Sequence, residues 1–93
     1  MHIARLIAIT EVKNVPQDIR PFVEFKAAVE QRELDANERV AILNIDTTSC
    51  YIPVFLKNPP TIADLEKYLE GQDAKLTPDS REALRTHLER KGK

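Results

Sequence analysis

The stretch PFVEFKAAVEQRELDANERVAILNIDTTSCYIPVFLK, residues 21–57, decides the fold that we predict for this chain. Two short breaks, at 35–37 and 47–50, divide it into three runs in which apolar residues recur at every second position. That period is typical of a strand with one buried face. With hairpin loops at both breaks, we predict three consecutive antiparallel strands at residues 21–34, 38–46 and 50–57.

The two loops also set a register between these strands. The first loop places Val29 opposite Leu43, and the second places Leu43 opposite Val54. Because a slip of one residue would turn every side chain to the other face, the agreement favours the double hairpin. The face that it predicts as core carries Val23, Phe25, Ala27, Val29, Ala41, Leu43, Ile45, Ile52, Val54 and Leu56.

A helix is the alternative for residues 21–34. The segment AAVEQREL, residues 27–34, is rich in good helix formers. On a helical wheel, however, Arg32 and Glu33 fall inside the apolar face, so the strand pattern is cleaner. The helix would change the element order to β-α-β-β-α-α.

Residues 2–12, HIARLIAITEV, predict the first strand, with apolar side chains on both faces. Such a strand is usually covered on both sides, yet in a simple meander it would lie at an exposed edge. Either the sheet curls so that this strand lies beside the fourth, or its edge and outer face meet another subunit. A long apolar edge left bare would favour aggregation.

The sheet should end at residues 59–60, because two consecutive prolines cannot continue a ladder. Thr61 follows as the expected N-cap of a helix over residues 61–70. Gly71 is a natural left-handed stop for that helix.

A second C-terminal helix is predicted over residues 78–90, with Thr77 as its cap and Pro78 at its first position. Its narrow apolar stripe indicates a peripheral place in the fold. The predicted fold class is therefore α+β: a four-stranded, mostly antiparallel sheet followed by two C-terminal helices.

Length and composition indicate one small domain, residues 1–93, with a sheet over 2–57 and a helical part over 61–90. The 14 basic and 15 acidic residues give a net charge of −1, so no overall field favours nucleic acid or a membrane. Cys50 is the single cysteine, which excludes an internal disulfide. No apolar run approaches the ~20 residues needed to span a bilayer. We therefore expect a cytoplasmic protein with no membrane partner.

The sequence carries no catalytic, cofactor or metal signature. Cys50 could act as a nucleophile, but neither His2 nor His87 is near it in sequence to serve as a base. The two histidines could join Asp46 in a metal site, yet the chain lacks paired ligands at metal-binding spacing. Its two glycines exclude a glycine-rich phosphate loop. We expect a protein that is not an enzyme, has no cofactor and takes no small-molecule substrate.

The opposite face of the predicted sheet is the best binding candidate. It mixes apolar and charged side chains, so it is too apolar to stay bare and too charged to be a clean core. The predicted binding residues are Lys26, Arg32, Val40, Ile42, Tyr51 and Phe55.

From this face we expect a small regulatory or protein-interaction module, acting as a homodimer or docking on a larger protein. The alternative is a single-stranded nucleic-acid binder that stacks bases on Tyr51 and Phe55 and neutralises phosphates with Lys26 and Arg32. The order of four strands followed by a helix resembles that of dimeric single-strand-binding modules of the Whirly type. This resemblance lies in element order alone and implies no site residue.

Overall fold

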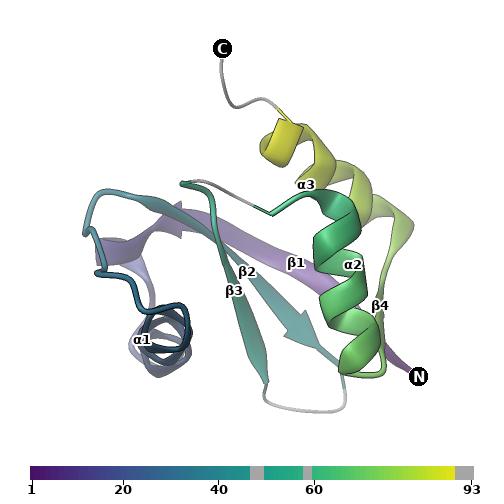
Figure 1. Ribbon diagram of the computed structural model, residues 1–93, viewed down its shortest axis with the longest axis horizontal. Coiled ribbons are helices and arrows are strands. Elements are labelled where there is room, and N and C mark those ends of the chain that lie inside the picture. The colour runs from purple at the N-terminus through teal and green to yellow at the C-terminus, as the bar shows by residue number, and fades with distance from the viewer. Residues whose placement is uncertain (47–49, 58–59, 90–93) are drawn as a thin grey trace.

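The computed structural model describes residues 1–46, 50–57 and 60–89. In these ranges the four strands form one mixed sheet of order β3-β2-β1-β4, in which only the β1–β4 pair is parallel. Helix α1 covers one face, and α2 and α3 cover the other (Figure 1). The α+β class, the four-stranded sheet and the two C-terminal helices are thus confirmed. The elements are β1 (His2–Glu11), the 3-10 turn η1 (Val12–Asn14), α1 (Arg20–Val29), β2 (Arg39–Ile45), β3 (Tyr51–Phe55), α2 (Ile62–Gly71), β4 (Ala74–Leu76) and α3 (Pro78–Glu89).

The predicted strand over residues 21–34 is wrong, and the helical alternative is correct for residues 21–29. Its element order, β-α-β-β-α-α, lacked the strand β4 between the two C-terminal helices. Helix α1 buries Val23 and Ala27, which are four residues apart and so face the sheet together. The same two residues also fit a period of two, which explains why the alternation was misleading. Consequently the hairpin pairings across 35–37 do not form, and the element order differs from that of the Whirly type.

Local signals explain both ends of α1. Pro21 lies in the first turn, where backbone N–H groups have no partner within the helix, so its missing N–H costs no helical hydrogen bond. At the other end Gln31 has a φ of 56°, and the N–H of Arg32 donates to the carbonyl of Ala27 at 3.0 Å. Gln31, in the left-handed conformation, ends the helix and turns the chain back toward β2.

Strand β1 is an inner strand rather than an edge. It lies between β2 and β4, with His2–Ala4 opposite Ala74–Leu76 in the parallel pair. No element was predicted at residues 74–76, which form β4. Its pairing with residues 2–4 replaces the predicted barrel-like closure beside the fourth strand, whereas a subunit contact along the rest of β1 stays a prediction. Helix α3 is also tied to this strand, because the N–H of Leu6 donates to Oγ of Ser80 at 3.0 Å.

The pairing of β2 with β3 keeps the predicted faces but not the predicted partners. Leu43 lies opposite Ile52, not Val54, so the register differs by two residues. A shift of two leaves every side chain on its original face. The residues predicted as core on these two strands are accordingly buried: Ala41, Leu43, Ile45, Ile52 and Val54.

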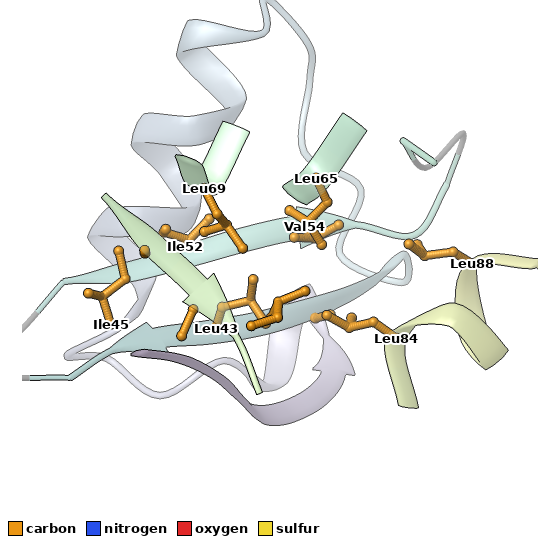
Figure 2. Close-up of a cluster of buried hydrophobic side chains, with 12 residues drawn as sticks. Leu43, Ile45, Ile52, Val54, Leu65, Leu69, Leu84 and Leu88 are labelled. Carbon is orange, nitrogen blue, oxygen red and sulfur yellow. The ribbon is translucent and has the colours of Figure 1, made fainter. Parts of the chain in front are cut away.

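The larger core cluster lies between the sheet and the two C-terminal helices. Figure 2 shows Leu65 and Leu69 of α2 and Leu84 and Leu88 of α3 directed toward the strands. Leu84 is 0% exposed, so the predicted peripheral position of this last helix is wrong. The apolar stripe of α3 is short, but its two leucines, Leu84 and Leu88, lie one turn apart and both enter the core. Two such side chains are enough to anchor the helix on the sheet.

The smaller cluster lies on the other face, under α1. The mixed face of the predicted sheet is therefore a second core layer, and its cover is the segment that we had predicted as a strand. Its buried members are Val12, Val15, Ile19, Val23, Ala27, Val40, Ile42 and Phe55.

Helix α2 begins as predicted but ends differently. Oγ1 of Thr61 accepts a hydrogen bond from the N–H of Asp64 at 3.1 Å, which confirms the N-cap. Gly71 is the last residue of the helix rather than its left-handed stop. Asp73 takes that conformation instead, with a φ of 56°, and leads the chain into β4.

We expect Thr61→Ala to lower the free energy of unfolding by about 1 kcal/mol, because the N–H of Asp64 loses its acceptor. Chemical denaturation followed by circular dichroism would measure this. Thr61→Ser is the matched control, because serine caps equally well and should remain within a few tenths of a kcal/mol of the wild type. Equal losses in both variants would contradict a capping role.

Candidate functional site

The structure divides the six predicted binding residues into two groups. Val40, Ile42 and Phe55 are core residues beneath α1. Lys26, Arg32 and Tyr51 are half-buried at the margin of that core. Only this second group is within reach of a molecule in solution, and it lies near the free edge of β3.

An ion-pair network joins α1 to the loop before β2. The guanidinium of Arg32 contacts Oε2 of Glu38 at 2.6 Å and Oε1 of Glu30 at 3.9 Å. The same guanidinium lies 4.3 Å from the ring centroid of Phe55, a cation–π distance. The other Glu38 oxygen accepts from the N–H of Asp35 at 3.3 Å. Arg32 is therefore held by two carboxylates and a ring, although its side chain stays 23% exposed.

Lys26, in the last turn of α1, is engaged in a similar way. Its Nζ lies 3.7 Å from Oε2 of Glu30 and 4.4 Å from the ring centroid of Tyr68 on α2. The two cations that the nucleic-acid hypothesis requires are thus already paired with carboxylates. Phe55, which was to stack a base, is buried.

An apolar hollow of about 460 Å³ opens between α1, the start of β3 and α2. Phe25 and Val29 form its outer wall and are 70% and 60% exposed. Phe22 packs edge-on against Tyr51, with ring centroids 5.4 Å apart. We call this feature the apolar hollow; the residues that matter below are Phe22, Phe25, Val29, Tyr51, Pro53 and Tyr68.

A second hollow of about 320 Å³ lies farther along β3. We call it the charged hollow, because its walls include Lys26, Glu30, Arg32 and Asp64. The two hollows follow the same strand edge between α1 and α2, which flank β3 in Figure 1. Lys26, Arg32, Tyr51 and Phe55, four of the predicted binding residues, line one or both of these hollows.

The exposed residues that give the apolar hollow its character were not among the predicted binding residues. Phe25 and Val29 were placed on the core face of a strand, whereas both are exposed on α1. Their spacing of four residues, with Phe22 three before Phe25, is the signal that a helical interpretation would have used.

The other candidate groups do not gather into a chemical site. Cys50 is half-buried at the margin of the apolar hollow. Nδ1 of His2 lies 4.0 Å from Oδ1 of Asp46, another member of the suggested metal set. Across residues 1–46, 50–57 and 60–89, no three His, Cys, Asp or Glu side chains are placed to hold a metal ion.

Comparison with known proteins places the chain in a family. Residues 2–88 match the family described as a domain of unknown function (DUF749). The chain belongs to this family. It is also 32% identical over 89 residues to the uncharacterized protein MJ0858 of Methanocaldococcus jannaschii, covering 95% of this chain and 79% of that protein. No solved structure matches the chain.

Helices in the described part of the chain are too short or too polar to cross a membrane. The longest of them, α3, has 12 residues, well below the ~20 that a span requires.

Proposed function

We propose that this protein is a non-enzymatic interaction module that docks onto another protein through the apolar hollow. The main support is the exposure of Phe25 and Val29, at 70% and 60%, on one side of α1. Both flank the hollow together with Tyr51 and Tyr68. Contiguous apolar surface that remains exposed typically marks a binding site, and aromatic side chains contribute most to the core of protein interfaces.

A larger protein is the partner that we favour, and a second copy of the chain is the alternative. Homodimer formation was first suggested by the doubly apolar first strand. In the fold, β1 is flanked by β2 and, at residues 2–4, by β4, so that reason is weaker. The stripe of Phe25 and Val29 on α1 remains available to either partner.

We further propose that the module acts in the cytoplasm, where its single thiol at Cys50 would stay reduced. We do not propose nucleic acid as its partner. Lys26 and Arg32 already pair with Glu30 and Glu38, so phosphate contacts would have to break these pairs.

The docking surface is tested with Phe25→Glu, which places a charge in the wall of the hollow. A partner first recovered by pull-down and then purified should bind the wild type as a defined complex. Loss of a buried aromatic anchor costs about 2 kcal/mol or more, so the variant should bind at least ~30-fold more weakly. Isothermal titration calorimetry would measure both affinities.

Ile7→Glu is the matched control. Ile7 is also a large exposed apolar residue, but it lies on β1, two strands away from β3. Its substitution should leave the affinity unchanged. Equal affinities for wild type and Phe25→Glu, or a strict monomer by light scattering with no partner recovered, would count against the proposed function.

A further inference from the structure

Lys26 and Tyr68 meet across the free edge of the sheet. Nζ of Lys26 lies 4.4 Å from the ring centroid of Tyr68, within cation–π range. Lys26 belongs to α1 and Tyr68 to α2, and these helices cover opposite faces of the sheet. Side chains from opposite faces can meet only around an edge, and β3 is the edge that lies between the two helices (Figure 1).

Strand β3 is enclosed to an unusual degree for an edge strand. Its residues 52–55 are all buried, although β2 is its sole strand neighbour among the described residues. Lys26, Pro53 and Tyr68 line both the apolar and the charged hollow. The Lys26–Tyr68 contact therefore lies over the middle of the strand and separates the two hollows.

The hydrogen bonds between β2 and β3 show which backbone groups of β3 point toward the Lys26–Tyr68 contact. The N–H of Ile45 donates to the carbonyl of Cys50 at 3.2 Å, and the N–H of Leu56 to that of Arg39 at 3.0 Å. Bonded pairs alternate in an antiparallel ladder, so the even residues of β3 face β2. The backbone groups of the odd residues, Tyr51, Pro53 and Phe55, face away from the sheet.

We propose that the Lys26–Tyr68 contact is a clasp that closes the edge of β3, and that opening it allows β3 to pair with β3 of a second copy. The outward pattern is self-complementary. With a two-fold axis at Pro53, Tyr51 of one copy lies opposite Phe55 of the other, and these two pairs exchange four backbone hydrogen bonds. Pro53 lies opposite Pro53 of the other copy. Because proline has no N–H, this pair adds no hydrogen bond.

The second copy also fits the apolar surface beside the edge. A two-fold axis perpendicular to the sheet keeps each α1 next to its copy, which brings Phe25 and Val29 into the interface. At 70% and 60% exposure, they would bury on the order of 200 Å² per copy. That is about a quarter of the ~800 Å² that each partner buries in a standard interface. Residues 52–55 are already buried in one copy, so the dimer would depend on the four backbone hydrogen bonds as well as on this area.

The clasp also has an ordinary physical use. Unpaired edges invite association with other chains, and natural sheets protect them with proline, lysine and covering side chains. The edge of β3 has all three: Pro53 in the strand itself, Lys26 from α1 and Tyr68 from α2. Glu30, at 3.7 Å from Nζ of Lys26, holds the lysine in place.

The test is the double variant Lys26→Ser/Tyr68→Ser, studied as the purified full chain. Light scattering should show the molar mass rising from that of one chain toward that of two. Hydrogen exchange should show slower exchange at the amides of Tyr51 and Phe55 than in the wild type. Adding Pro53→Ala supplies two further N–H donors at the axis and should tighten the dimer at least ~5-fold.

Two control variants accompany the double variant. Lys26→Arg retains a cation over the Tyr68 ring and should keep the edge closed. Lys67→Ser, next to Tyr68 but outside both hollows, should behave as the wild type. Circular dichroism would verify that each variant is folded, which the exposed position of Tyr68 favours.

A folded double variant that stays monomeric, or a dimer whose Tyr51 and Phe55 amides exchange as fast as in the monomer, would overturn the clasp. Slow exchange of these amides in a wild-type dimer would do the same. Failure of the clasp would leave docking of a larger protein through the apolar hollow untouched, because Phe25→Glu tests that docking with a separate purified partner.

Discussion

Leu84→Ala is expected to lower the free energy of unfolding by roughly 2–5 kcal/mol. Leu84 is 0% exposed and packs in the cluster between the sheet and α2. Its truncation removes buried methyl groups and leaves a cavity that the surrounding strands can fill only partly. For a chain of this size the loss corresponds to a fall in Tm of roughly 8–40 °C. Thermal and chemical denaturation would both measure it.

Leu84→Met is the control for this prediction. It keeps the side-chain volume and should cost less than ~1.5 kcal/mol. A loss below ~1 kcal/mol for Leu84→Ala would instead mean that α3 packs loosely on the rest of the fold, as its short apolar stripe suggested.

Arg32→Ala is expected to have the second largest effect, about 3 kcal/mol of lost stability. The side chain of Glu38 is 3% exposed and contacts the Arg32 guanidinium at 2.6 Å. Without that cation, a buried carboxylate would keep only the N–H of Asp35 as a partner at 3.3 Å. Equilibrium urea denaturation at neutral pH would measure the loss.

The ion pair of Arg81 with Glu66 is a matched control for burial. It has the same 2.6 Å separation, but its side chains are 44% and 37% exposed. Exposed pairs contribute at most about 1 kcal/mol, so Arg81→Ala should have a much smaller effect. Equal losses for Arg32→Ala and Arg81→Ala would show that burial of Glu38 is not what makes its pair important.

Local signals in the sequence predicted much of the fold. Thr61 caps α2 through one hydrogen bond to a residue three positions on, so a short motif contains the whole interaction. Thr77 likewise accepts from the N–H of Ser80 at the start of α3. The face of each residue in β2 and β3 follows from alternation alone, which is why the faces were right although the register was not.

The errors arose where distant parts of the chain decide the structure. β4 has three residues, too few for a recognisable pattern, and it forms because the N-terminal end of β1 offers it a partner. For α1, Val23 and Ala27 fit both a helix and a strand. The choice between them depends on the burial of Val40 and Ile42 on β2, which α1 covers.

Contacts between distant parts of the chain also explain why the candidate site was predicted only in part. Lys26, Arg32 and Tyr51 lie beside the hollows, because charged and amphipathic residues stay near the surface in either local structure. Val40 and Ile42 were assigned to a binding face that α1 in fact covers. Phe25 was missed because a strand directs it inward, whereas the helix directs it outward.

The parallel pair of β1 and β4 has a consequence for the order of folding. β1 is the first strand to be synthesised, yet the partner for one of its edges is more than seventy residues away in the chain. Until Ala74–Leu76 emerge, an inner strand must persist with that edge unpaired. Contacts of such long sequence separation slow folding, and a waiting strand edge exposes the nascent chain to association. Completion of the sheet therefore depends on one of its shortest elements.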